Sequence, residues 1–320
     1  MLKRMAPVLL CLVPLIAGSG CVESKSVITL NADGKGKMQL DVLMPSPSAA
    51  DFGGPKPKDL SLDDQRNQAV AKMLTDAKGV TAWKDVTAEW NADGRLHFVA
   101  TAYFDKLDKV EIQPIPLPTF QVVPEKAGVL KLTGKFGNKD NPVTAPDTKP
   151  LPDPKKLSDK ELDEEILKQR IGYQASRPML VGVFTDYKAT TTFNLPGKAG
   201  DAKGFAKEGD KVARHELVGG DVIKAIDGVM KKDTATLRKM IRDSGTLKSL
   251  DTNQLEQFAD IPASMNPSVT VTDATKDIFD YDKEMKQARD GSAALREKFK
   301  VDSKKPWPWE HTGSGSPPPR

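Results

Sequence analysis

One tetrapeptide, Asn-Ala-Asp-Gly, occurs twice in this chain, and each copy lies between two stretches that alternate apolar and polar residues. The copies stand at 31–34 and 91–94. Alternation around a turn that contains Asp-Gly is a strong signal for a β-hairpin, because the glycine tolerates the positive φ that such turns need. The flanking sequences differ, so we interpret the tetrapeptide as repeated turn chemistry rather than as a structural repeat. The fold must therefore accommodate two antiparallel hairpins, at about 27–44 and 86–104.

The segment between the hairpins has the pattern of an amphipathic helix. Ser61 is a candidate N-cap with acidic residues in the following turn, and Gly79 ends the pattern. One stripe of this helix is apolar: Leu62, Ala69, Val70, Met73, Leu74 and Ala77. The order hairpin, helix, hairpin predicts an α+β fold, in which an antiparallel sheet of hairpins has helices packed on one face.

The rest of the chain alternates between predicted strands, helices and loops. Residues 129–133, 187–195, 211–218 and 268–272 have strand patterns, and a Gly, Lys and Asp-rich loop is expected from 197 to about 210. A capping box at 158–161 opens a helix, which Pro178 should break or kink, and residues 179–184 are compatible with either helix or strand. Further helices are expected at 221–230, 233–242, 253–258 and 281–299.

These patterns divide the chain into six regions. They are a signal peptide at 1–20, a polar tether at 21–26, a hairpin-helix-hairpin α+β region at 27–127, a second α+β region at 128–219 with a Pro-rich loop at 137–156, a mostly helical C-terminal region at 220–300 and a disordered tail at 301–320.

The N-terminus has the layout of an export signal. Lys3 and Arg4 precede an uncharged, mostly apolar run at 5–17, and small residues then lead to Cys21. The run is shorter than the ~20 residues that a membrane-spanning helix needs. Gly18-Ser-Gly-Cys21 resembles a bacterial lipobox, in which the cysteine becomes the new N-terminus and carries lipid such as palmitate, although Gly18 stands where leucine is usual. The alternative is ordinary cleavage near Gly18, which would leave Cys21 as a free thiol.

The cysteine count also favours lipid attachment at Cys21. The chain contains only Cys11 and Cys21, and Cys11 would leave with the signal peptide, so the mature chain can form no internal disulfide. Acylation would protect the remaining thiol, and two or more acyl chains anchor a protein stably. We therefore expect a partner in the membrane itself, with the protein on the extracytoplasmic side of the bacterial envelope. Val22 replaces the aspartate that often retains lipoproteins in the inner membrane, which favours the outer membrane.

Charge gives no reason to expect nucleic acid as a partner. The chain has 48 Lys and Arg against 44 Asp and Glu, a formal net charge of +4, and two of these cations lie in the signal peptide. Nucleic-acid binding proteins usually carry a strong basic excess on one face.

No pattern of catalytic, cofactor-binding or metal-binding residues emerges. We interpret His97, His215 and His311 as surface histidines, and His215-Glu216 lacks the second histidine of a zinc helix because residue 219 is glycine. The glycine-rich segment 197–204 lacks the Gly-Lys-Ser/Thr ending of a phosphate-binding loop and is interpreted as a flexible turn. The sequence therefore predicts a protein that is not an enzyme, with neither cofactor nor metal.

Two tryptophans near the C-terminus, Trp307 and Trp309, are the remaining unusual feature. They could contact a partner, a glycan or the membrane interface. The preferred interpretation is that they pack back over the sheet and end the fold.

Several stretches together resemble a known group of proteins. After the lipobox and the first hairpin come Trp90 to Asp105, then Phe193-Asn-Leu-Pro-Gly197, and finally a helix start at Phe279-Asp-Tyr281. This order resembles uncharacterised lipoproteins of planctomycete-type bacteria, and more loosely the LppM-like lipoprotein domain, which also ends a strand in Pro-Gly after a long helix. The resemblance implies a membrane-anchored, extracytoplasmic α+β protein and supplies no catalytic residues.

Two functions fit these sequence features. The first is a non-enzymatic binding or structural module of the cell envelope, with another envelope protein as partner. The second is a carrier that holds a lipid or other amphiphile in an apolar groove between sheet and helices. Four methionines would suit the lining of such a groove: Met38, Met44, Met73 and Met179.

Overall fold

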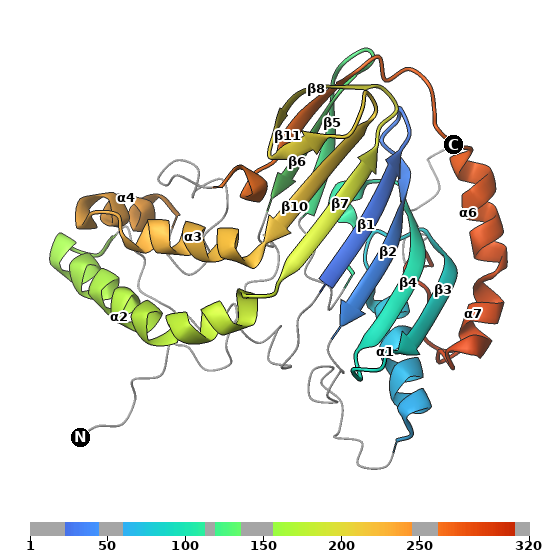
Figure 1. Cartoon of the computed structure of the whole chain (residues 1–320), viewed down its shortest axis with the longest axis horizontal. Coiled ribbons are helices and arrows are strands. Elements are labelled where there is room, and N and C mark those ends of the chain that lie inside the picture. The colour runs from blue at the N-terminus through green and yellow to red at the C-terminus, as the bar shows by residue number, and fades with distance from the viewer. Residues whose placement is uncertain (1–22, 45–59, 113–118, 136–155, 245–261, 311–320) are drawn as a thin grey trace, which may run out of the picture.

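A computed structural model describes residues 23–44, 60–112, 119–135, 156–244 and 262–310 of the chain. The protein consists of two β-sheets with helices packed against them, so the predicted α+β class is confirmed (Figure 1). Strands from the two predicted α+β regions share both sheets, and the predicted boundary at 127/128 falls in the turn of a hairpin.

The larger sheet has seven strands in the order β3-β4-β2-β1-β7-β10-β9. Only β1 and β7 pair in parallel, and their neighbours pair antiparallel. The strands are β1 (Glu23–Leu30), β2 (Gly36–Met44), β3 (Ala82–Trp90), β4 (Leu96–Phe104), β7 (Lys188–Asn194), β9 (Phe205–Lys207) and β10 (Val212–Val218).

Both predicted hairpins are present. The turn between β1 and β2 contains Gly34 at φ +85°, and the turn between β3 and β4 contains Gly94 at φ +73°. Each glycine donates its N–H to the carbonyl of the asparagine that opens its tetrapeptide, at 3.0 Å. The left-handed conformation explains why glycine stands at this place in both turns.

The first strand begins earlier than the sequence indicates. Residues 23–26, predicted to be part of a tether, belong to β1, so that prediction is wrong for these positions. Glu23 pairs with Leu43 on one side and with Lys188 on the other. The polar side chains Ser24 and Ser26 point into the protein, which hides the strand from a search for apolar alternation.

The smaller sheet has four strands in the order β5-β6-β11-β8, all paired antiparallel. They are β5 (Thr119–Lys126), β6 (Val129–Lys135), β11 (Ser268–Thr272) and β8 (Lys198–Lys203). The loop predicted from 197 to about 210 is therefore wrong, because it forms β8 and β9. Gly197 lies against the β11 backbone, where a Cβ atom would come within 2.0 Å of the Thr272 carbonyl oxygen.

The main hydrophobic core lies on the inner face of the larger sheet. Helix α1 (Leu62–Asp76) covers this face beside β3, as the sequence predicts, although Leu62 of its predicted stripe is exposed. The smaller sheet contributes apolar residues to the same core. Its largest buried side chains are Trp83, Trp307, Phe98, Phe104, Phe193, Ile28, Leu30, Leu40, Met73, Leu74 and Leu96.

Three helices form an arm beside one end of the sheet: α2 (Asp159–Phe184), α3 (Gly219–Met230) and α4 (Thr234–Ser244) (Figure 1). The predicted capping box is present at the start of α2, where Ser158 and Glu161 satisfy each other's backbone N–H groups. Residues 179–184 are helical, and α2 continues through Pro178. The helix predicted at 253–258 lies outside the described residues.

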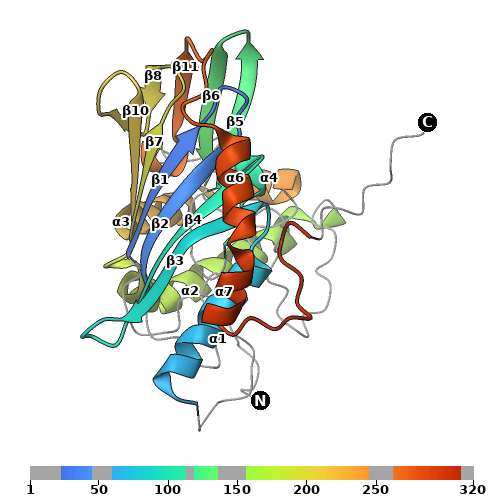
Figure 2. The same cartoon turned by 90° about the vertical axis from the view of Figure 1, so that its right-hand side faces the viewer.

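The outer face of the larger sheet is covered beside its β3 edge by α6 (Tyr281–Asp290), and α7 (Ser292–Lys298) continues along it (Figure 2). Residues 301–310 then return to the main core, so the tail predicted from 301 is wrong over these ten positions. Val301 and Trp307 are buried, and Trp309 packs against the same core. The preferred interpretation of the two tryptophans is thus confirmed. Covering β3 also protects an edge that could otherwise pair with another chain.

Candidate functional site

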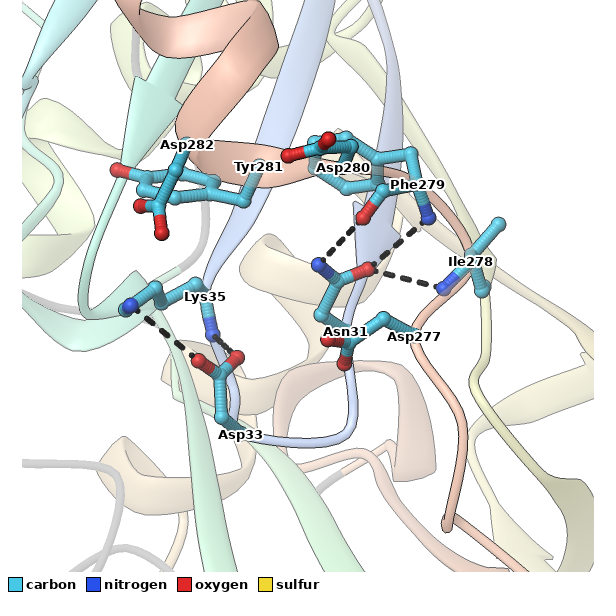
Figure 3. A pocket seen from close by; sticks show the side chains of 9 residues that line it. All are labelled: Asn31, Asp33, Lys35, Asp277, Ile278, Phe279, Asp280, Tyr281 and Asp282. Carbon is cyan, nitrogen blue, oxygen red and sulfur yellow. Dashed lines mark hydrogen bonds and ion pairs between the residues drawn. The ribbon is translucent and has the colours of Figure 1, made fainter.

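An open depression of about 470 Å³ lies where the first hairpin meets the start of α6. Its lining comes from two segments that are about 245 positions apart in sequence, the β1–β2 turn and residues 277–282 (Figure 3). The lining residues are Asn31, Asp33, Lys35, Asp277, Ile278, Phe279, Asp280, Tyr281 and Asp282.

Asn31 joins the two segments. Its side-chain Oδ1 accepts hydrogen bonds from the backbone N–H groups of Ile278 at 3.0 Å and Phe279 at 3.3 Å, and its Nδ2 donates to the Phe279 carbonyl at 2.9 Å (Figure 3). Only 2% of Asn31 is exposed. A buried amide that satisfies three backbone groups is a structural clamp, and it aligns the segment that leads into α6.

The charged residues of the depression are engaged with their neighbours. Lys35 Nζ lies 3.5 Å from Asp33 Oδ2 and 5.4 Å from the centre of the Tyr281 ring. The Asp33 carboxylate raises the pKa of Lys35, with smaller contributions from Asp282 and Asp105. The Tyr281 hydroxyl lies 2.8 Å from the Thr81 hydroxyl and 2.9 Å from Asp105, and burial raises its pKa, so it stays protonated at neutral pH.

Two residues after the last lining residue, Glu284 on α6 connects the helix to the outer face of the sheet. It accepts hydrogen bonds from Lys37 at 2.7 Å and Tyr103 at 2.9 Å. Burial acts to raise the pKa of Glu284, but these bonds outweigh it and hold the pKa below its ordinary value. The polar groups around the start of α6 therefore dock the helix on the sheet.

The depression has four aspartates but no geometry for a bound cation. Within the described parts of the chain, no three or more His, Cys, Asp or Glu side chains are grouped so that they could hold a metal ion. Asp277 accepts a bond from the Ala32 N–H at 3.0 Å, and Asp280 caps α6 through the Lys283 N–H. These bonds give two of the four carboxylates a structural role.

The structure separates the predicted surface histidines. His97 is exposed on the outer face of β4, with Nε2 2.8 Å from Asp41 Oδ1, as predicted. His215 is fully buried between the Phe120 and Phe205 rings, so its assignment to the surface is wrong. It occupies an inward position of β10, which alternates Ala213, His215 and Leu217 on the core side. His311 lies outside the described residues.

The buried side chain of His215 makes one hydrogen bond to the described part of the chain. Its Nε2 lies 2.6 Å from the Ser264 carbonyl oxygen, to which only a protonated Nε2 can donate, and Nδ1 has no hydrogen-bond partner among the described residues. Burial lowers the pKa of His215 below 6.5, while the Ser264 carbonyl and the Glu216 charge act in the opposite direction. The neutral imidazole is the form that fits this apolar surrounding.

We expect acid to destabilise the protein through His215. Because its pKa is lower in the folded than in the unfolded chain, the unfolded chain binds more protons between the two values. The free energy of unfolding should fall as the pH drops from about 6.5 toward the lower, folded-state pKa, by at most about 1.4 kcal/mol per pH unit for this one proton, and then level off.

Urea denaturation of His215→Leu at several pH values tests this expectation. The variant should lose most of the slope between pH 6.5 and 5 that the parent shows, while the control His97→Gln, at an exposed site, should retain it. An unchanged slope in His215→Leu would contradict the assignment.

The four methionines proposed for an amphiphile groove are not brought together. Met38, Met44 and Met73 are buried in the main core, whereas Met179 is exposed on α2. Cys21, the predicted lipid attachment residue, lies outside the described residues, and β1 begins two residues after it.

Comparisons with known proteins provide little beyond this geometry. No protein-family model and no curated protein matches the sequence. Among solved structures, the chain is similar to the folded domain of LppM from Mycobacterium tuberculosis, determined by NMR, with 11% identity and a TM-score of 0.28 over 62% of this chain and 82% of that one. A likeness this distant carries no argument about function. The resemblance to planctomycete-type lipoproteins has no counterpart among these comparisons.

Sequence reasoning missed the role of Asn31 and the depression around it. The only available signal was the Asn-Ala-Asp-Gly tetrapeptide, which predicts the same local turn at both of its copies. The apolar exposed face of α2, described below, was also missed, because apolar residues on two opposite faces of one helix give no single stripe.

Proposed function

We propose that this protein is a non-enzymatic binding or structural module of the bacterial cell envelope, anchored by lipid on Cys21 and facing the extracytoplasmic side. The observation that carries the proposal is the N-terminal layout, in which Lys3 and Arg4, an apolar run and small residues lead to Cys21. Acyl chains on that cysteine would supply the membrane partner.

The start of the fold is consistent with a short anchor. Strand β1 begins at Glu23, and two residues of fully extended chain span at most about 7 Å. An anchored Cys21 would therefore keep one end of the larger sheet at the membrane. Within the residues that the structure describes, no helix is both long and apolar enough to cross a bilayer.

The intact mass of the N-terminal peptide from membrane-extracted protein tests the anchor. We expect a peptide that begins at Cys21 and carries two or three acyl chains. Cys21→Ser is the matched control, and it should lack the adduct and leave the membrane fraction. An unmodified peptide that begins before Cys21 would contradict the proposal and make the protein an exported chain with a free thiol.

The packing of the methionines favours a binding module over an amphiphile carrier. Met38, Met44 and Met73 fill the core between sheet and helix. Native mass spectrometry separates the two functions, because a carrier should co-purify with an extractable lipid beyond the acyl chains on Cys21, and a binding module should not. Cross-linking in intact cells would then identify the envelope neighbour of a binding module.

A further inference from the structure

Helix α2 has apolar side chains on two opposite faces. On one face, Leu162 and Ile166 pack against α3 and α4, and Tyr173 and Leu180 pack against α3. On the other face, Leu167, Ile171 and Met179 are exposed by 59%, 48% and 43%. Together with Ala175 these residues recur every fourth position, so they form one stripe about 18 Å long. We call Leu167, Ile171, Ala175 and Met179 the α2 stripe.

The α2 stripe is the largest concentration of exposed apolar groups in the described chain. The described chain has seven exposed large hydrophobic residues, and three of them belong to the stripe. From Leu167 to the end of α2 the sequence has no aspartate or glutamate, and Lys168 is an exposed cation beside the stripe, whereas Arg177 is paired with Asp227 on α3. An apolar stripe with a basic neighbour suits the boundary between acyl chains and anionic head groups.

The register of the sheet places α2 near the proposed anchor. Three residues separate the end of α2 at Phe184 from the start of β7 at Lys188, which pairs with Glu23, the first residue of β1. Cys21 can lie at most about 7 Å from Glu23. Figures 1 and 2 show α2 running from this end of the sheet, and Figure 1 shows it on the far side of α3 and α4 from the smaller sheet. The stripe faces away from α3 and α4, because its residues are opposite those that pack on them.

A second pair of apolar residues lies at the same end. The strand register aligns four residues of four neighbouring strands in one row: Glu89, His97, Leu43 and Glu23. Trp90, the last residue of β3, therefore lies at the same end of the sheet as the start of β1. Trp90 Nε1 donates to the Leu62 carbonyl at 3.0 Å, and the Leu62 side chain is exposed at the start of α1. Apolar groups on two separate helices are thus presented near the anchor.

We propose that the α2 stripe rests on the surface of the membrane that holds the lipid on Cys21. This inference depends on the proposed function, because it requires the anchor. Once the acyl chains are inserted, the stripe is held close to the bilayer, so its effective concentration at the membrane surface is high. The burial of a modest apolar area is then enough to populate the contact. The contact would orient the sheet, with the depression at Asn31 directed away from the membrane.

A fluorescent probe on α2 tests the contact. If Cys21 is acylated, an introduced cysteine is the only free thiol of the mature chain, so Ile171→Cys can be labelled selectively with an environment-sensitive dye. Asp210→Cys is the matched control, because Asp210 is exposed beside the end of β10 opposite Val218, and Val218 pairs with Lys188. The lipidated proteins are placed in vesicles of phosphatidylcholine with a minor share of phosphatidylglycerol.

We expect the dye at Ile171→Cys to emit at shorter wavelength and to be quenched by aqueous iodide several-fold less than the dye at Asp210→Cys. Adding Leu167→Glu should remove the protection of a dye at Met179→Cys. Both positions are exposed, so the double change leaves the core intact. Equal quenching at Ile171 and Asp210 in acylated, vesicle-bound protein would overturn the contact and leave the anchor standing.

Two other results have distinct meanings. If the N-terminal mass shows no acyl chain, the anchor fails, and the contact fails with it. If Ile171→Cys is equally protected in Cys21→Ser protein without vesicles, a second copy or another part of this chain covers the stripe, and the membrane contact is overturned.

Discussion

Replacing Trp307 by alanine is expected to lower the free energy of unfolding by about 3–5 kcal/mol, the usual cost of removing a large buried aromatic side chain. Only 2% of Trp307 is exposed, and its ring belongs to the main core. It stacks on Trp309 with ring centres 5.1 Å apart, and the Arg296 guanidinium lies 4.7 Å from its centre. The variant would leave a cavity where the C-terminal segment closes the core.

Urea denaturation measures this effect, and Trp309→Ala is the matched control. Trp309 is partly exposed and stacks on the same ring. Its removal should cost about 1–2 kcal/mol, because an exposed aromatic contributes less by burial. If the two variants lose the same small amount, residues 301–310 do not close the core as described, and the prediction of a disordered tail would stand.

Replacing Asn31 by alanine is expected to lower the free energy of unfolding by about 2–4 kcal/mol. The change removes three hydrogen bonds to the backbone of Ile278 and Phe279 and leaves those groups without these partners. Each unsatisfied buried polar group costs about 1–3 kcal/mol, and partial access of water lowers the total. The loss should also loosen α6, since the segment that leads into it depends on this clamp.

The chain offers a matched control, because Asn91 opens the same tetrapeptide. Among the described residues, the Asn91 Oδ1 accepts only from its own turn, from the N–H groups of Asp93 at 3.0 Å and Arg95 at 2.8 Å. Water can replace such bonds in this exposed turn, so Asn91→Ala should cost about 1 kcal/mol or less. Thermal unfolding and amide exchange in residues 281–290 measure both effects. An equal loss in the two variants would argue against the clamp.

The two hairpins and the helix caps were predictable from the sequence because their interactions are local. Gly34 and Gly94 adopt positive φ within four-residue turns, and Ser61 and Ser158 cap helices through residues only three positions away. Such interactions involve few residues, so a short stretch of sequence contains all the partners that decide them.

Strand β8 shows why other elements were not predictable. Its sequence, Lys-Ala-Gly-Asp-Ala-Lys, has no apolar alternation. It is a strand because β11, about seventy positions later, offers a partner for its backbone. Backbone hydrogen bonds between strands do not depend on which side chains are present. The sequence of a polar strand at the edge of a sheet can therefore look like that of a loop.

The candidate sites divide in the same way. Cys21 could be proposed from the sequence because an export signal is a linear pattern. The α2 stripe could not, because the sequence does not show which apolar face of α2 is buried. Packing against α3 and α4 buries one face and leaves Leu167, Ile171 and Met179 outside.

The sequence by itself determined where this chain turns, where its first long helices begin and which cysteine could carry lipid. Only the tertiary structure decided that Asn31 clamps a distant segment while Asn91 closes its own turn, that His215 is buried, and that Trp307 completes the core. The physical reason is that burial and hydrogen bonding depend on partners that folding brings together. Identical tetrapeptides can therefore have different roles when only one of them meets a partner 248 positions away.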